Sequence, residues 1–221
     1  MNIHKIWGAL EINHCLVCGS LQPANGGLCQ WCLVMLNQQI PPYHGAISDT
    51  QVKALYEWNP QQSDALSHLM HSLKGHQQIK MKFWAQQWIH QWKKTLDENT
   101  EMLLVPAPRQ SESPDHAAIF ARHLSDILGI PLLDVLRLSK PRDQKNKKAK
   151  SSREDWSKDN VIVSINDSWT QHILDELDDY RVVFIDDVIT TGSTAQRSFE
   201  ALNYFGKKEV WTIARRTLAC G

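Results

Sequence analysis

Four of the five cysteines in this 221-residue chain lie close together near the amino terminus. Cys15 and Cys18 form one CxxC pair, and Cys29 and Cys32 form a second pair after a glycine-rich turn. Such an arrangement can place four thiolates at the corners of a tetrahedron, which is the geometry of structural zinc. Two disulfides or four reduced thiols are the alternatives, and His14 could replace one ligand. We expect a zinc ion that stabilises the fold, because no coordination position is left open for a substrate.

A second group of reactive residues lies in the stretch VVFIDDVITTGST, from Val182 to Thr194. Its apolar start is typical of a strand buried on both faces, and ligands of parallel sheets bind beyond the carboxyl ends of such strands. Asp186 and Asp187 follow the apolar residues, so their carboxylates could accept hydrogen bonds from sugar hydroxyls. The hydroxyl-rich turn around Gly192 leads into a predicted helix, whose free amide groups favour an anion. The pattern therefore predicts a sugar phosphate site, and the alternative is a buried strand before an ordinary capped helix.

The elements that would position these residues can be predicted from residue 102 onward, where strands alternate with helices. This alternation indicates a largely parallel sheet covered by helices on both faces. We expect strands at 102–105, 161–165, 182–185 and 209–214, and helices at 114–128, 168–177 and 194–205. Before them we expect a strand or hairpin at 45–58 and helices at about 60–73 and 77–96.

Three tryptophans, Trp84, Trp88 and Trp92, recur at four-residue spacing in the second of these early helices. They could form a base-stacking platform or a partner surface. A single apolar stripe on a helix is more often its buried face, so core packing is the favoured interpretation.

The segment from Leu136 to Arg153 is strongly basic, with eight Lys or Arg residues and one acid, Asp143. It has no apolar periodicity, which favours a solvated loop. Because it lies inside an α/β pattern, a lid or a phosphate-contacting loop is the functional alternative.

The overall composition limits the classes of partner. Lys plus Arg and Asp plus Glu number 24 each, so no global field recruits nucleic acid or a membrane. No apolar run approaches the roughly 20 residues that a bilayer span needs, and no leader is evident. We expect a cytoplasmic protein without membrane insertion.

The stretch from Val182 to Thr194 resembles the phosphoribosyl pyrophosphate (PRPP) signature of type I phosphoribosyltransferases at every position. A cysteine module followed by such a domain is similar to the ComF/GntX group, the competence protein F-like proteins. The resemblance implies an α/β fold: a Rossmann-like parallel sheet flanked by helices, with a small amino-terminal zinc-binding module. We expect a double zinc ribbon-like module at 1–42 and a phosphoribosyltransferase-like domain at 43–221.

The resemblance also implies roles for individual residues. Asp186 and Asp187 would hold the 2- and 3-hydroxyls of the ribose, with Mg²⁺ accompanying PRPP. The 5-phosphate would be bound by Thr190, Thr191, Gly192, Ser193 and Thr194.

The strand that ends in VPAP, at 105–108, is similar to the family strand whose following loop contacts pyrophosphate. Lys74 and Arg109 are the candidate catalytic cations, and Gln144 and Arg153 could match a glutamine and an arginine of the family's mobile loop. In place of the family's RGFNQ-like run, this chain has RQSESPDH at 109–116, so its acceptor side differs.

Two functions are compatible with these features. The first is Mg-dependent phosphoribosyl transfer to an acceptor that the sequence does not identify, with a role in DNA uptake during natural transformation implied by the resemblance. The alternative is a non-catalytic PRPP-fold protein that binds single-stranded DNA beside a ComFA-type helicase.

Overall fold

The computed structural model describes residues 15–21, 26–59, 61, 66–67, 69–70, 81–97, 100–109, 115–138, 161–164 and 168–217. Its centre is a five-stranded sheet with the strand order β1-β2-β7-β6-β3. β1 forms an antiparallel edge, and the other four strands run parallel, as the alternating pattern predicted. The strands are β1 (Tyr43–Ile47), β2 (Thr50–Trp58), β3 (Met102–Pro106), β6 (Arg181–Ile189) and β7 (Glu209–Arg216).

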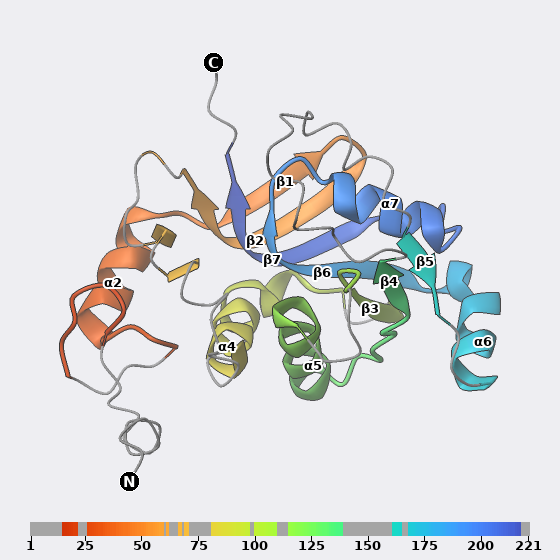
Figure 1. Cartoon of the computed structure of the whole chain (residues 1–221), viewed down its shortest axis with the longest axis horizontal. Helices are drawn as coiled ribbons and strands as arrows, with labels where there is room; N and C mark the ends of the chain where they lie inside the picture. The colour runs from red at the N-terminus through yellow and green to blue at the C-terminus, as the bar shows by residue number, and fades with distance from the viewer. Residues whose placement is uncertain are drawn as a thin grey trace, which may run out of the picture.

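Helices cover both faces of this sheet (Figure 1). On one face lie α4 (Met81–Trp92) and α5 (His116–Leu128), and on the other lies α7 (Ser193–Ala201). α2 (Gln30–Gln39) belongs to the cysteine-rich segment, and α6 (Ser168–Asp175) precedes β6. Short 3-10 turns, η2 (Lys93–Thr95) and η5 (Leu177–Asp179), follow α4 and α6. None of these described helices has the length and apolar character that crossing a lipid bilayer requires.

The apolar run of β6 packs against both helical layers. Val183 and Ile185 belong to the apolar cluster on the α4 and α5 side. Val182 and Phe184 belong to the other cluster, where the Phe184 ring lies 6.2 Å from that of Phe199 in α7. Because alternate side chains of a strand point to opposite faces, a strand between two layers needs an uninterrupted apolar run.

The tryptophan stripe of α4 is buried, which confirms core packing as its role. Trp84 and Trp88 have no exposed surface, and Trp92 is only 6% exposed. The Trp88 ring stacks on that of Trp211 in β7, with 4.3 Å between centroids. These contacts fasten α4 to the sheet and leave the three rings unavailable for stacking on bases.

The strand predicted at 161–165 does not join the main sheet. Instead β5 (Val161–Val163) pairs antiparallel with β4 (Leu136–Leu138), which the sequence analysis did not predict, in a separate two-stranded sheet. Ile162 is 45% exposed while its two neighbours are half-buried, so only one face of β5 packs. The predicted helix at 60–73, the start of that at 77–96 and the basic segment at 140–153 lie mostly or wholly outside the described residues.

The cysteine-rich segment packs against the same core as the sheet. Cys15, Cys29 and Leu36 belong to the apolar cluster that contains α4 and α5. Polar contacts reinforce this packing: Tyr56 Oη donates to Asn37 Oδ1 at 2.7 Å, and Trp84 Nε1 donates to the Gly26 carbonyl at 3.1 Å. One apolar core thus contains residues from both sides of position 42. The domain boundary predicted there stays a prediction.

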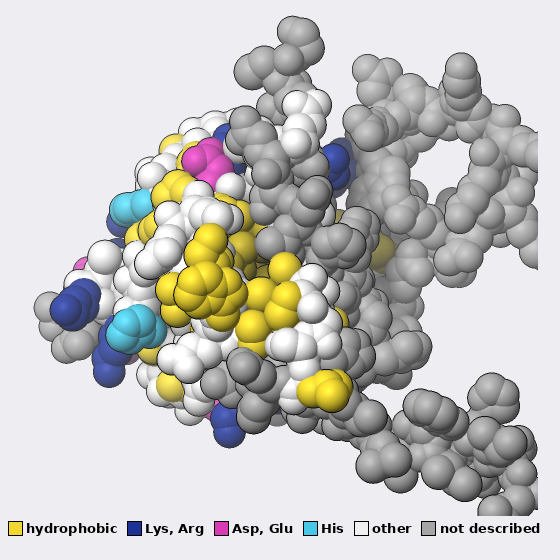
Figure 2. Space-filling view, turned by 90° about the vertical axis from the view of Figure 1, so that its left-hand side faces the viewer, with side chains coloured by type: hydrophobic (Ala, Val, Ile, Leu, Met, Phe, Trp, Pro, Cys, Tyr) yellow, Lys and Arg dark blue, Asp and Glu magenta, His cyan; other side chains and the backbone are white. Residues whose placement is uncertain are grey.

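Figure 2 looks onto the side of the molecule that carries α2, where hydrophobic side chains gather in the middle of the face and charged ones lie around it. The sequence explains this distribution, because residues 15–42 contain no Asp, Glu, Lys, Arg or His. The large hydrophobic side chains that are exposed in the described part of this segment are those of Val17, Leu21, Trp31 and Val34.

Candidate functional site

A pocket of about 210 Å³ opens beside the carboxyl ends of β3 and β6. The parallel pairing of these strands continues into the following loop, where the Ala107 amide donates to the Ile185 carbonyl at 2.8 Å. This hydrogen bond holds the loop after β3 next to the aspartate pair of β6. The polar side chains that line the pocket are those of Asp115, His116, Asp186, Asp187 and Thr194.

Asp186 and Asp187 both line this pocket. The strand predicted at 182–185 would have placed them after its end, but they lie within β6. β6 continues to Ile189 because β7 extends far enough to pair with it, and Asp186 lies opposite Thr212. Both aspartates are half-buried. The strand therefore fixes the backbone of the two carboxylates more firmly than a loop would.

The electrostatics of the pocket are dominated by its carboxylates. Burial, followed by the charge of Asp187, raises the pKa of Asp186 well above the usual range of an aspartate. Burial also raises the pKa of Asp115, and the charge of Asp187 adds to this effect. The pocket thus disfavours full ionisation of its three carboxyl groups, and hydroxyl donors or a cation would reduce the free-energy cost of charging them.

The hydroxyl-rich loop from Thr190 to Thr194 leads directly into α7, whose first residue is Ser193, one position earlier than predicted. Gly192 is the N-cap, with φ of 77° in the left-handed region, and offers no side chain to cap the helix. Thr191 Oγ1 partly fills that role by accepting from the Ser193 amide at 3.4 Å. The positive end of α7 is therefore only weakly capped, which suits an anionic ligand.

The two predicted catalytic cations have different positions. Lys74 lies outside the described residues. Arg109 is 8% exposed, and its Nη2 lies 2.8 Å from Asp134 Oδ2, while Arg137 Nη1 lies 2.9 Å from the other oxygen of that carboxylate. The Arg109 carbonyl also accepts from the Leu138 amide at 3.0 Å. This arrangement ties the loop after β3 to β4, so Arg109 supports one wall of the pocket, and its catalytic role stays a prediction.

Sequence reasoning gave Asp115 and His116 no individual role and named them only within the run at 109–116, which it connected with the acceptor side of the site. Asp115 is the N-cap of α5, and its Oδ1 accepts from the Ala118 amide at 3.1 Å. His116 is half-buried, and its Nδ1 is buried without a hydrogen-bond partner among the described residues. The signal was available: a helix that follows a parallel strand starts at the same edge of the sheet where that strand ends.

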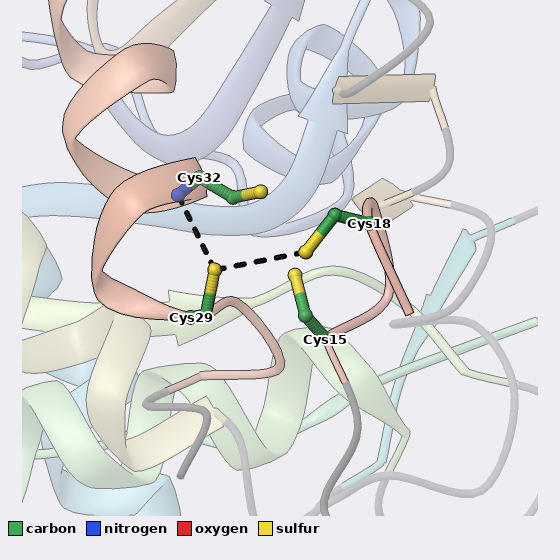
Figure 3. Close-up of side chains that lie close together, drawn as sticks. All are labelled: Cys15, Cys18, Cys29 and Cys32. Atoms are coloured by element: carbon green, nitrogen blue, oxygen red, sulfur yellow. Dashed lines mark hydrogen bonds between the residues drawn. The ribbon is translucent and has the colours of Figure 1, made fainter. Parts of the chain in front are cut away.

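The four cysteines lie together at a separate centre (Figure 3). Their sulfur atoms all lie within 4.8 Å of one another, and Cys18 Sγ is 3.8 Å from Cys29 Sγ. They are the one cluster of three or more metal-binding side chains in the described part of the chain. Burial and the neighbouring thiols raise the pKa of Cys32, so forming its thiolate costs free energy. A bound cation would remove that cost. The donor set and spacing fit a zinc ion.

Comparison with known proteins gives one family match: residues 81–214 match the phosphoribosyl transferase domain. No curated protein matches the chain. Among solved structures, a hypoxanthine phosphoribosyl transferase of Trypanosoma cruzi is 13% identical over 66% of this chain and 64% of its own length, with a TM-score of 0.35. A purine phosphoribosyltransferase from Pyrococcus horikoshii Ot3 is 20% identical over 62% of this chain and 87% of its own, with a TM-score of 0.34.

The alignment to the Trypanosoma cruzi protein thus spans less than two thirds of that protein. The family match covers more than half of the present chain and contains the strands β3, β6 and most of β7, together with both aspartates. The chain belongs to the phosphoribosyl transferase domain family.

Proposed function

We propose that the chain binds PRPP in the pocket beside β3 and β6 and transfers its phosphoribosyl group to a nucleophilic acceptor. The observation that carries this proposal is the convergence of Asp186, Asp187 and Thr194 on one pocket, at the weakly capped start of α7. Carboxylates suit vicinal hydroxyls, and a helix start suits a phosphate. The aspartates lie next to the start of α7, so together they suit a ligand such as ribose 5-phosphate, which carries both hydroxyls and a phosphate.

In this proposal Asp186 and Asp187 accept hydrogen bonds from the 2- and 3-hydroxyls, while Thr190 to Thr194 bind the 5-phosphate. The ligand then extends toward the loop after β3, where pyrophosphate would lie. The residues orient the sugar and stabilise developing charge, which are the main contributions expected in a reaction that proceeds through an oxocarbenium-like state. Lys74 and Arg109 remain the proposed cations.

We further propose that Mg²⁺ enters with PRPP. The described pocket residues do not form a cluster of three ligands close enough to hold an ion by themselves, so most ligands would come from the substrate. Such an ion would neutralise the charge of pyrophosphate as it leaves.

Calorimetric titration with Mg²⁺ and PRPP tests the binding step, and pyrophosphate release across a panel of bases and other nucleophiles tests transfer. We expect saturable binding that requires Mg²⁺, and release that depends on one acceptor class. If the intact chain has no affinity for either PRPP or ribose 5-phosphate, the proposed function is wrong.

The finer assignment to the ComF/GntX group, with a role in DNA uptake, is also a proposal. It is supported by the order of the cysteine centre and the phosphoribosyl transferase domain in one chain. In it, Cys15, Cys18, Cys29 and Cys32 hold a structural zinc ion.

Single-stranded DNA binding beside a ComFA-type helicase is the alternative. The uncharged sequence of residues 15–42 offers no cations for a phosphate backbone, so the basic segment at 140–153 would have to supply them. Neutralising Lys145, Lys147, Lys148 and Lys150 together should then weaken DNA binding and flatten its salt dependence. If DNA affinity and its salt dependence are unchanged in this variant, PRPP chemistry is the better explanation of the protein's function.

A further inference from the structure

Asp115 and His116 are the polar pocket residues that the proposed function has not yet used, and Asp115 is already engaged as the N-cap of α5. The Nδ1 of His116 is buried and lacks a hydrogen-bond partner among the described residues, although its side chain lines the same pocket as the aspartate pair. A buried nitrogen without a partner costs free energy in the unliganded protein. Such a cost is typical of a group whose partner is a ligand.

The composition of the pocket indicates what kind of ligand atom this partner is. Among the described lining residues, His116 is the one with a basic side chain, and the other ionisable groups are Asp115, Asp186 and Asp187. Arg109, on the neighbouring loop, directs its Nη2 to Asp134. An anionic group that enters this acidic pocket therefore requires a donor, and His116 is placed to provide it.

The stereochemistry of PRPP then indicates which of its anionic groups lies near His116. Its pyrophosphate is attached at C1 on the same face of the ribose ring as the 2- and 3-hydroxyls. If Asp186 and Asp187 hold those hydroxyls, the pyrophosphate lies on the aspartate side of the ring, toward Pro108 and the start of α5. The acceptor attacks from the opposite face, so a residue beside the aspartates does not reach it.

We infer that His116 donates a hydrogen bond from Nδ1 to the pyrophosphate of bound PRPP. This inference rests on the proposed function and adds the residue that contacts its leaving group. As the C1–O bond breaks, its electron pair remains on the pyrophosphate oxygen, and the lone pair of the acceptor forms the new bond to C1. The Nδ1–H group stabilises the charge that accumulates on pyrophosphate, without any required transfer of its proton.

The test compares three ligands that differ in the group His116 contacts. Mg-PRPP, Mg-pyrophosphate and ribose 5-phosphate are titrated into the intact chain by calorimetry. His116→Ala should weaken binding of the first two by at least about tenfold, the effect of losing one hydrogen bond to a charged group. Affinity for ribose 5-phosphate should stay within about twofold, because that ligand carries no pyrophosphate.

Two further variants make the test independent of general damage to the fold. His116→Asn places an amide donor near the position of Nδ1 and should recover part of the pyrophosphate affinity. His123→Ala removes a histidine two turns farther along α5, outside the pocket lining, and should change none of the three affinities.

Equal losses for ribose 5-phosphate and PRPP in His116→Ala would overturn the inference, because they would indicate a disturbed pocket and not a lost pyrophosphate contact. Unchanged pyrophosphate affinity would overturn it as well, while leaving the proposed function intact. If the parent chain binds ribose 5-phosphate and PRPP but not Mg-pyrophosphate, and His116→Ala spares PRPP, the inference also fails. A parent that binds none of the three ligands removes the proposed function and this inference together.

Discussion

The backbone amide of Asp187 donates a hydrogen bond to Oδ1 of Asp186 at 2.8 Å. One oxygen of the Asp186 carboxylate is thereby engaged by the adjacent peptide group, which limits rotation of the side chain. The carboxylate is therefore positioned next to that of Asp187 before any ligand arrives. Preorganisation of this kind reduces the entropy that binding would otherwise cost.

The first prediction concerns this pair of carboxylates. Changing both Asp186 and Asp187 to Asn should weaken Mg-PRPP binding by at least about tenfold, because hydrogen bonds to charged acceptors are stronger than those to neutral ones. The fold should be retained, since asparagine has the same shape. Calorimetry and thermal melts measure the two effects. Parent-like affinity in the double variant would show that the carboxylates do not hold the ribose.

The second prediction concerns the pH dependence of stability without ligand. The pKa of Asp186 is raised in the folded state, so the native protein binds this proton more tightly than the unfolded chain does. The free energy of unfolding should therefore fall as the pH rises above about 4, the ordinary pKa of an aspartate, and through the raised pKa. Asp186→Asn should reduce this decline, leaving the smaller contribution of Asp115.

Urea unfolding at a series of pH values provides the measurement. Asp126→Asn, which changes an exposed aspartate of α5, is the matched control and should keep the slope of the parent. A stabilising effect of Asp186→Asn that is equally large at pH 4 and pH 8 would contradict this explanation.

The third prediction concerns Gly192, whose φ of 77° is unfavourable for any other residue. A β-carbon there would lie 3.3 Å from Cγ2 of Ile47 in β1, so substitution adds a close contact to backbone strain. Gly192→Ala should destabilise the chain by about 1 to 2 kcal/mol and weaken PRPP binding. Gly192→Val should abolish PRPP binding.

Gly129→Ala is the control for this experiment, because Gly129 also has a positive φ, of 70°, but an added β-carbon would meet nothing within 4 Å. It should show a similar loss of stability with unchanged PRPP affinity. If Gly192→Ala and Gly192→Val both bind PRPP like the parent, the loop around Gly192 does not bind the 5-phosphate.

The fourth prediction concerns Asp134, which bridges Arg109 and Arg137. Asp134→Ala removes the carboxylate that both guanidinium groups share, and we expect a loss of about 1.5 to 3 kcal/mol in the free energy of unfolding. PRPP affinity should fall as well, because the ion pairs hold the loop after β3 against β4. Denaturant unfolding and calorimetry measure these effects. A variant with normal stability would show that the bridge contributes little.

The fifth prediction concerns the cysteine centre. Cys29→Ser should lower the zinc content found by elemental analysis and the melting temperature of the whole chain. Cys15 and Cys29 are part of the core cluster shared with α4 and α5, so we expect a single transition. Coincident melting by far-UV circular dichroism and tryptophan fluorescence checks this. A zinc-free preparation that is fully folded would refute the metal assignment.

Much of the fold could be predicted from the sequence because its signals are local. The four-residue tryptophan spacing gave the buried face of α4, and the helix predicted at 114–128 is α5, which begins two residues later because Asp115 is its N-cap. The order of apolar strands and helices indicated a parallel sheet, but it wrongly suggested that residues 161–165 belong to it. The predicted aspartates and Thr194 of the hydroxyl-rich loop do line one pocket, because a single strand and the turn after it carry them.

The remaining features depend on contacts between distant segments. Asp186 and Asp187 belong to β6 because β7 pairs with Asp186 and with the residues that follow Asp187, and this pairing is not encoded within the stretch itself. His116 joins the pocket only because the pairing of β3 with β6 brings the start of α5 beside them. The ion pair between Arg109 and Asp134 likewise joins residues on either side of α5.

The position of β7 in the sheet has a consequence for how the chain folds during synthesis. β7 lies between β2 and β6 and is the last of the described strands to be made. Until residues 209–216 leave the ribosome, the β1–β2 hairpin and the β3–β6 pair are separate, each with an unpaired edge that another chain could extend. The first register pair, Gln51 with Glu209, also spans most of the sequence, and such distant contacts make folding slow. The aspartate pair therefore acquires its final backbone geometry only when the last strand is inserted at the middle of the sheet.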